Sequence, residues 1–221
     1  PDWVYGFPEM ALGQRDKIKA SKRISNPGCY PTGFIALVRP LVERGLVPEE
    51  YPVTVNAISG YSGGGKSLIA EFEAGGDPYR AYGLNQQHKH APEMSYHACI
   101  ANRPVFTPAV GKYAQGMIVE VPLALWNLPD TDEGLVEFYL ALAGAYRGEP
   151  FITVQTPFES NKISGLAPEA RNGTNMLDLF VFGNDEQARL IARYDNLGKG
   201  ASGAAVQNMN IVLGFDEATG L

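Results

Sequence analysis

The stretch Asn26-Pro27-Gly28-Cys29-Tyr30-Pro31-Thr32 joins a turn to the start of a helix. Asn-Pro-Gly is typical of turns, and Pro31 is a favoured first helical residue. Apolar residues then recur with helical spacing, which predicts a helix over residues 31–44, with Pro40 bending it or ending it early. The recurring residues are Phe34, Leu37, Val38, Leu41 and Val42. Cys29 is therefore expected just before a helix N-terminus.

This position favours a reactive thiol at Cys29. The helix dipole and the free amide groups of the first turn stabilise an anion, which lowers the pKa of a thiol. The same amides can hold the oxyanion of a carbonyl under attack. The alternative is a small buried cysteine with a packing role, and this is our interpretation of Cys99, which has no comparable setting.

The three histidines of the chain, His88, His90 and His97, fall within ten residues of one another. A nucleophilic cysteine needs an acid or base at hydrogen-bond distance, and only this cluster can supply a histidine. A metal site formed with Glu93 is the alternative. We expect no metal, because no carboxylate pair or second cysteine completes a ligand set.

A glycine-rich stretch, Gly60-Tyr61-Ser62-Gly63-Gly64-Gly65-Lys66-Ser67, matches the P-loop pattern G-x-x-x-x-G-K-[ST]. It lies between a predicted strand over residues 52–59 and a predicted helix over residues 66–73. Free backbone amides, a helix N-terminus and a lysine predict a cradle for phosphate. A P-loop NTPase is thus an alternative function, although strands rather than repeated strand–helix units follow the motif.

The remaining pattern predicts an α+β fold with a mixed or antiparallel sheet and helices on one face. The first 30 residues are polar and rich in turns, and the segment with the histidines reads as loop. Strands are expected at 115–123, 150–158, 175–182 and 188–194, and helices at 131–146 and 202–213, the last ended by Gly214.

Composition narrows the function classes. The 221 residues are 45% hydrophobic with a net charge of −6, which suits a globular protein and argues against nucleic-acid binding. No apolar run approaches the roughly 20 residues of a membrane span. Two cysteines do not form a disulfide framework, so a reducing, cytoplasmic setting is expected.

Four motifs together resemble the N-acetyl-gamma-glutamyl-phosphate reductase family, in the shorter of its two types. They are Asn26–Thr32, Ser59–Lys66 (SGYSGGGK), His88–Glu93 (HKHAPE) and Gly200–Asn210 (GASGAAVQNMN), and the resemblance runs from about residue 4 to residue 214.

The resemblance implies a fold of the semialdehyde-dehydrogenase and glyceraldehyde-phosphate-dehydrogenase type. It implies NADPH-dependent reduction of N-acetyl-L-glutamyl 5-phosphate to N-acetyl-L-glutamate 5-semialdehyde in arginine biosynthesis, through a thioester on Cys29. His88 would be the acid and base, with His90 next to it and Tyr82 nearby. Relatives are dimers or tetramers, so a homo-oligomer is expected.

The resemblance also assigns the cofactor side of the site. NADP or the substrate phosphate would lie against the glycine-rich loop, and Asn208 would meet the nicotinamide carboxamide. The loop residues concerned are Ser59, Gly60, Ser62, Gly63 and Lys66. The substrate carboxylate could bind Lys66, Arg103 or Lys199.

The family opens with a G-x-x-G-x-x-G turn that this sequence lacks. We therefore expect residues 1–28 to be a remnant of an N-terminal NADP-binding Rossmann domain, most of which is missing. Residues 29–196 would form the catalytic and dimerisation domain, and residues 197–221 the helix that returns to the NADP-binding domain. Two other functions stay open: a lysine-pathway reductase of an aminoadipyl phosphate, and a cysteine hydrolase.

Overall fold

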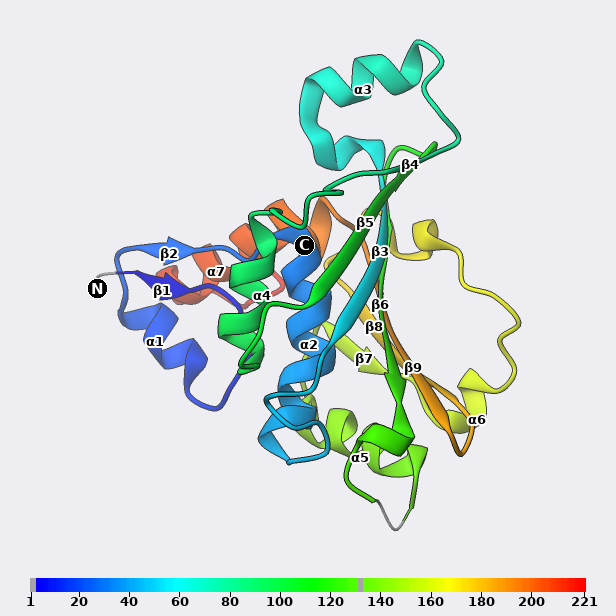
Figure 1. The fold of residues 1–221 in the computed structure, drawn as a ribbon. Coiled ribbons are helices and arrows are strands. Elements are labelled where there is room, and N and C mark those ends of the chain that lie inside the picture. The colour runs from blue at the N-terminus through cyan, green and yellow to red at the C-terminus, as the bar shows by residue number, and fades with distance from the viewer. Residues whose placement is uncertain (1–2, 131–132) are drawn as a thin grey trace.

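The computed structural model describes residues 3–130 and 133–221 and is built on a seven-stranded mixed sheet (Figure 1). The strand order is β4-β5-β3-β6-β9-β8-β7. The strands are β3 (Thr54–Gly60), β4 (Tyr79–Ala81), β5 (Val105–Gly111), β6 (Met117–Ala124), β7 (Ile152–Val154), β8 (Leu177–Gly183) and β9 (Gln187–Tyr194). The β3–β5 and β7–β8 pairs are parallel and the other neighbours antiparallel.

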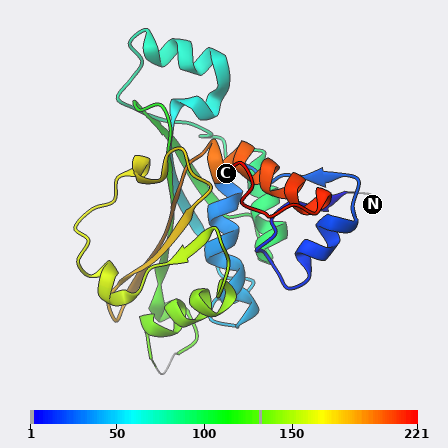
Figure 2. The same ribbon diagram turned by 180° about the vertical axis from the view of Figure 1, so that it is seen from behind.

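Four helices lie on one side of this sheet, as Figures 1 and 2 show from opposite directions. They are α2 (Cys29–Glu43), α4 (His90–Ala98), α5 (Leu135–Ala145) and α7 (Gly203–Leu213). The α2 helix lies in the middle, and its side chains at Phe34, Leu37 and Leu41 are completely buried. The predicted α+β architecture with helices on one face is therefore confirmed.

The proline inside α2 does not end the helix. Pro40 has no N–H to donate to the carbonyl of Ala36, four residues earlier. The hydroxyl of Tyr146 donates to that carbonyl instead, at 2.9 Å. A side chain from the end of α5 thus replaces the missing backbone hydrogen bond, and α2 runs on to Glu43.

The first 28 residues hold more structure than their polar composition indicates. Strands β1 (Val4–Tyr5) and β2 (Ile24–Ser25) pair in parallel, and α1 (Gln14–Ala20) connects them. This unit packs against α7. A strand–helix–strand unit is the repeating element of dinucleotide-binding domains, but the assignment of these residues to such a domain stays a prediction.

A buried ion pair ties this N-terminal unit to the C-terminal part. Lys199 lies on a π-helical turn, η4 (Gly198–Ser202), and its Nζ is 2.7 Å from Oε1 of Glu9, with both side chains almost completely buried. Burial alone would raise the pKa of Glu9, but Lys199 and a hydrogen bond from Gln207 outweigh it and lower that pKa. The end of α7 at Gly214, in the left-handed conformation, confirms the predicted cap.

Other elements differ from expectation for local reasons. The predicted strand over 150–158 stops at Val154, because Thr156 caps a short helix, α6 (Pro157–Ser160), with its hydroxyl accepting from Glu159 N–H. The loop expected around the histidines contains α4, β4 and β5. The predicted start of the helix at 131–132 lies outside the described residues, and α5 begins at Leu135.

The remaining elements are short. They are η1 (Tyr61–Gly64), α3 (Gly65–Glu73), η2 (Leu125–Asn127) and η3 (Pro168–Arg171). None of the helices in the described ranges has the length and apolar character needed to traverse a bilayer.

The hydrogen bond that replaces the one lost at Pro40 gives a stability prediction. Changing Tyr146→Phe leaves the Ala36 carbonyl without its donor, so the free energy of unfolding should fall by about 1–2 kcal/mol. Urea unfolding followed by circular dichroism measures this. Tyr139→Phe on α5 removes a hydroxyl with no hydrogen bond among the described residues and is the matched control. Equal effects of the two changes would contradict the assignment.

Candidate active site

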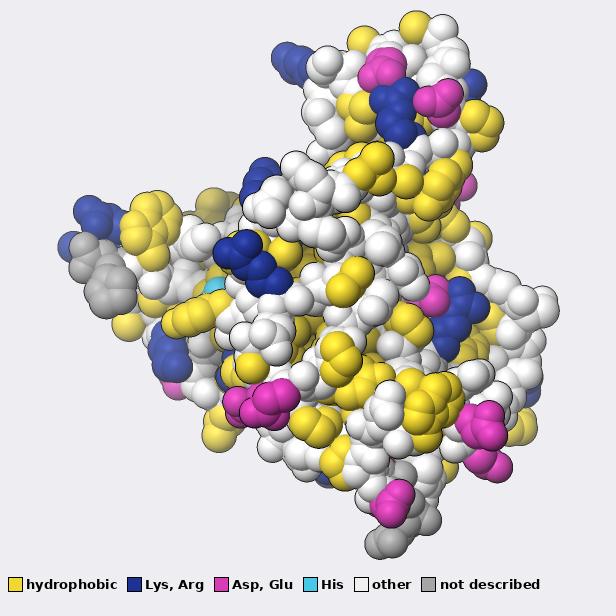
Figure 3. Space-filling view, viewed as in Figure 1, with side chains coloured by type: hydrophobic (Ala, Val, Ile, Leu, Met, Phe, Trp, Pro, Cys, Tyr) yellow, Lys and Arg dark blue, Asp and Glu magenta, His cyan; other side chains and the backbone are white. Residues whose placement is uncertain are grey.

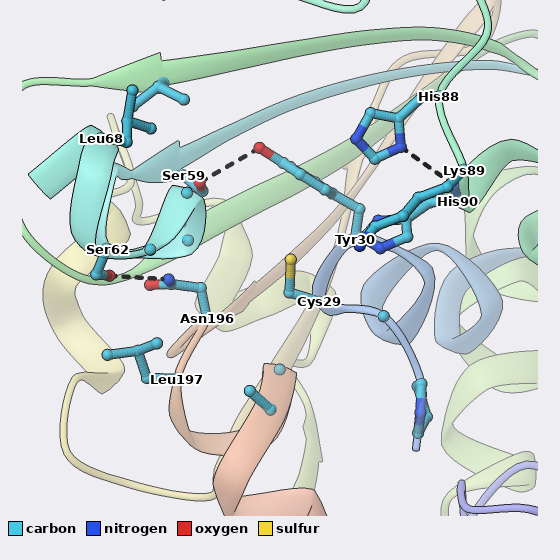
Figure 4. A pocket seen from close by; sticks show the side chains of 18 of the residues that line it. Cys29, Tyr30, Ser59, Ser62, Leu68, His88, Lys89, His90, Asn196 and Leu197 are labelled. Atoms are coloured by element: carbon cyan, nitrogen blue, oxygen red, sulfur yellow. Dashed lines mark hydrogen bonds between the residues drawn. The ribbon is translucent and has the colours of Figure 1, made fainter. Parts of the chain in front are cut away.

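A cavity of about 820 Å³ opens where the N-terminus of α2 meets the glycine-rich loop, the histidine motif and the η4 turn (Figure 4). The thiol of Cys29 points into it. The other residues lining it include Tyr30, Ser59, Tyr82, His88, Lys89 and His90. Segments far apart in the sequence therefore form one cleft around the expected nucleophile.

The turn before Cys29 is held by close packing. A Cβ on Gly28 would lie only 2.5 Å from Nε2 of His90, so only glycine lets this imidazole approach the turn. The Gly28 N–H donates to Oε1 of Glu93 at 2.8 Å, and the Tyr5 hydroxyl donates to the same oxygen at 2.7 Å. Glu93, on α4, thus fixes the residue before the thiol.

Cys29 is the first residue of α2, rather than the residue before it as expected. Burial of the thiol raises its pKa to about 11. The backbone N–H groups of Tyr30 and Cys29 and the charge of Lys89 act in the opposite direction without overcoming burial. The expected lowering of the thiol pKa is therefore wrong for this structure, because desolvation of the charged form outweighs the helix N-terminus.

Two of the three histidines line the cavity. The backbone N–H of His90 donates to Nδ1 of His88 at 3.1 Å. Because Nδ1 accepts this hydrogen bond, a neutral His88 carries its proton on Nε2. Burial, followed by the charge of Lys89, lowers the pKa of His88. Burial and the neighbouring charges of His88 and Lys89 lower the pKa of His90 to about 4. His97 stacks on Tyr5 at 3.5 Å between ring centroids, away from the cavity.

A row of hydroxyl groups runs from the tyrosines that pack against the histidines to the glycine-rich loop. Tyr82 donates to the Tyr30 hydroxyl at 2.9 Å, and Tyr30 donates to Oγ of Ser59 at 3.3 Å. Ser59 in turn donates to the Gly60 carbonyl. The row connects the expected nucleotide loop to the helix that carries Cys29.

The first part of the glycine-rich loop is bound to the protein's own backbone. The N–H groups of Gly60, Tyr61 and Ser62 donate to the carbonyls of Gly116, Tyr113 and Ala114. These amides are used inside the protein and cannot surround a phosphate as a P-loop does. The NTPase interpretation loses its structural basis.

Only some of the residues expected to bind the cofactor line the cavity. Ser59, Ser62 and Gly63 line the cavity, whereas Gly60 and Lys66 are not among its lining residues. The side chain of Asn208 is buried, and its amide donates to Gly6 O and to Asn26 Oδ1, at 2.8 Å each. Asn208 therefore secures the turn at Asn26, which itself borders the cavity.

The two positively charged side chains that line the cavity were not predicted from the sequence. Lys89 and Arg80 line it, and Arg80 is paired with Glu71 and Asp77. Lys89 forms no ion pair within the described residues. In the sequence, its position between His88 and His90 is the feature from which its place in the cavity could have been predicted.

The cations expected from the sequence to bind the substrate carboxylate lie elsewhere. The side chains of Lys66 and Arg103 are exposed outside the cavity. Lys199 is buried against Glu9.

Small residues make up part of the cavity wall. Gly200, Ala201, Ser202 and Ala205 form a wall of small residues facing Cys29, and a Cβ on Gly200 would lie 3.1 Å from the Cβ of Cys29. Such a wall accepts a flat ring close to the thiol. Among the described residues, no group of three or more His, Cys, Asp or Glu side chains is placed to hold a metal ion.

The fold and the cysteine at a helix N-terminus define a protein of the semialdehyde dehydrogenase class. A family model described as semialdehyde dehydrogenase, dimerisation domain, matches residues 29–196. Aspartate semialdehyde dehydrogenase II from Vibrio cholerae shares the fold, with a TM-score of 0.67, 16% identity, and coverage of 96% of this chain and 68% of that chain. The enzyme from Francisella tularensis gives a TM-score of 0.64 at 14% identity, with 96% and 71% covered.

Curated relatives define the family within this class. N-acetyl-gamma-glutamyl-phosphate reductase 2 of Nostoc sp. is 51% identical over 234 residues, which cover 99% of this chain and 72% of the relative. The N-acetyl-gamma-glutamyl-phosphate reductase of Brucella ovis is 50% identical over 222 residues, with 97% and 71% covered. The chain belongs to the N-acetyl-gamma-glutamyl-phosphate reductase family, as the sequence motifs indicated.

The raised pKa of Cys29 predicts how this thiol reacts. Only the thiolate is nucleophilic, and a pKa of about 11 leaves on the order of one thiol in 10,000 ionised at pH 7. In a Cys99→Ser background, alkylation by iodoacetamide should therefore accelerate about tenfold per pH unit from pH 7 to 10. Mass spectrometry of the modified protein follows the rate, and Cys29→Ser in the same background gives the blank. A rate that levels off below pH 8 would contradict a raised pKa.

Proposed function

We propose that this chain carries the catalytic centre of an NADPH-dependent N-acetyl-gamma-glutamyl-phosphate reductase that forms N-acetyl-L-glutamate 5-semialdehyde in arginine biosynthesis. The observation that carries the proposal is the position of Cys29 on the first turn of α2, in one cavity with His88 and His90. The identity of about half with curated reductases supports the choice of substrate. Both cysteines are free, which suits the reducing cytoplasm.

The first step is acylation of Cys29. Its sulfur attacks the acyl carbon, a C–S bond forms, the C–O bond to phosphate breaks, and phosphate leaves. Because the thiol pKa is about 11, a base must accept its proton. His88 is our choice from its place in the motif, and Nδ1, which accepts the His90 backbone N–H in this structure, is the nitrogen that would take the proton. Lys89, without an ion-pair partner in the described chain, would stabilise the phosphate.

The second step needs a hydride, which NADPH supplies when it is bound. The N–H groups of Cys29 and Tyr30, which already face the thiol, would hold the oxyanions of both steps. His88 would then hand its proton to the oxygen of the thiohemiacetal and take it back as the C–S bond breaks. The small residues Gly200 and Ala201 leave room for the nicotinamide beside Cys29, and Ser62 and Gly63 line the same side of the cavity.

Acylation can be tested without the cofactor. Mixed with N-acetylglutamyl phosphate, the purified protein should release phosphate and gain one acyl group on Cys29, detected by intact mass. Cys29→Ser should abolish both signals. His88→Gln should slow acylation at pH 7 by about 100-fold, the usual contribution of a general base, whereas His97→Gln, outside the cavity, should leave it unchanged.

The outcomes separate the alternatives. Acylation of the Cys29→Ser variant would overturn the mechanism. Faster acylation by an aminoadipyl phosphate would identify the lysine-pathway relative, and release of the free acid without nucleotide consumption would identify a hydrolase.

We also propose that two copies pair through the outer face of the sheet. This face lies opposite the helices, and hydrophobic side chains gather on the surface over the sheet in Figure 3. Ile58, Ile118, Tyr79 and Leu84 line a shallow hollow there, and the latter two are 61% and 81% exposed. The name of the matching family model, a dimerisation domain, supports the pairing.

If two copies associate through this face, a charged substitution in the hollow should lower the molar mass of the protein in solution. Ile118→Asp places a charge in the hollow and should convert a dimer into a monomer in light scattering after size-exclusion chromatography. Leu12→Asp introduces the same charge at a fully exposed loop position and should leave the mass unchanged. A dimer that persists in Ile118→Asp would exclude this face.

A further inference from the structure

A tyrosine hydroxyl is inserted into the first turn of the helix that carries Cys29. Tyr194 is the last residue of β9 and is completely buried. Its hydroxyl donates to the carbonyl of Cys29 at 2.5 Å and accepts the N–H of Gly33 at 3.0 Å. In a regular α-helix these two backbone groups, four residues apart, bond to each other. Tyr194 therefore bridges the Cys29–Gly33 pair, which follows the direct Gly28–Thr32 hydrogen bond at the start of α2.

The packing holds this hydroxyl in place. A Cβ on Gly33 would lie 2.7 Å from Cε1 of Tyr194, so the ring lies directly against the helix backbone. The backbone of Tyr194 is paired on both sides, with Met117 of β6 and Leu177 of β8. Burial, followed by the charge of a Cys29 thiolate, raises the pKa of Tyr194 well above its ordinary value. The hydroxyl therefore keeps its proton and remains a donor.

The bridge acts on the peptide group next to the nucleophile. The carbonyl of Cys29 and the N–H of Tyr30 belong to the same peptide unit, and this N–H stabilises the Cys29 thiolate. A donor on the carbonyl polarises the unit and makes its N–H a stronger donor, because hydrogen bonds in a chain reinforce one another. The path runs from the Tyr194 hydroxyl through the Cys29 carbonyl and the Tyr30 N–H to the thiol.

We propose that Tyr194 is a positioning residue for Cys29: it holds the Cys29–Tyr30 peptide group so that its N–H stabilises the thiolate and the oxyanion formed on it. Neither the motifs nor the cavity lining include Tyr194. It acts from beneath the site through the backbone.

The chain provides a matched control for this role. Tyr146 also donates a buried hydroxyl to a carbonyl of α2, that of Ala36, which lies seven residues further along the helix. Loss of either hydroxyl should lower stability to a similar extent. Only Tyr194 is bonded to the turn that carries the thiol, so only its loss should change the reactivity of Cys29.

The experiment measures iodoacetamide alkylation of Cys29 against pH in a Cys99→Ser background. Tyr194→Phe should slow alkylation at pH 8 by about threefold to tenfold, the equivalent of one hydrogen bond, and displace the rate profile towards higher pH. In the reductase assay it should lower kcat and leave the KM for NADPH unchanged. Tyr146→Phe should leave the profile and kcat unchanged at temperatures where both variants are folded.

Coincident profiles for Tyr194→Phe and Tyr146→Phe would overturn the proposal. Should Tyr194→Phe fail to fold, Gly33→Ala pushes the same ring away from the helix and must show the same displaced profile. The proposal rests on the proposed role of Cys29, but alkylation requires neither substrate nor NADPH. If the protein shows no reductase activity but Tyr194→Phe still displaces the alkylation profile, the proposed function fails and the positioning role of Tyr194 stands.

Discussion

The close packing around the first turn of α2 is the constraint on which the site depends. His90 lies against Gly28, where a Cβ would be 2.5 Å from the imidazole, and the η4 turn lies against Cys29 through Gly200. Glu93 binds the backbone on one side of the thiol, and Tyr194 binds it on the other. Because these contacts come from α4, β9 and η4, the nucleophile has a defined position only after the whole chain has folded.

The same packing sets the electrostatics of the site. Burial disfavours the thiolate more than the first-turn amides and Lys89 favour it, so Cys29 rests as a thiol. Burial also lowers the pKa of both His88 and His90, which favours their neutral forms near pH 7. A protonated thiol in one cavity with two neutral imidazoles is the arrangement from which the proposed attack on an acyl phosphate would start.

Several elements could be predicted because their signals are local. The helix after Cys29, the strand before the glycine-rich loop and the end of α7 at Gly214 follow from periodicity and capping. Strand β5, next to the edge strand β4, was missed because Pro108 interrupts its pattern, and its pairing with β3 and β4 compensates only in the folded sheet. The β1–α1–β2 unit was missed because its strands have two residues each and depend on packing against α7.

The sequence by itself determined the helix that carries Cys29, the α+β class and the family, because these rest on neighbours along the chain and on motifs of fixed spacing. The tertiary structure decided which groups share the cavity with the thiol: Lys89 rather than Lys66, and His88 and His90 rather than His97. It also brought the Tyr194 hydroxyl, at the end of β9, to the Cys29 carbonyl. It also decided that the N–H groups of Gly60, Tyr61 and Ser62 bind the protein's own carbonyls. Burial and contacts between distant segments set these outcomes, and neither is encoded in local sequence.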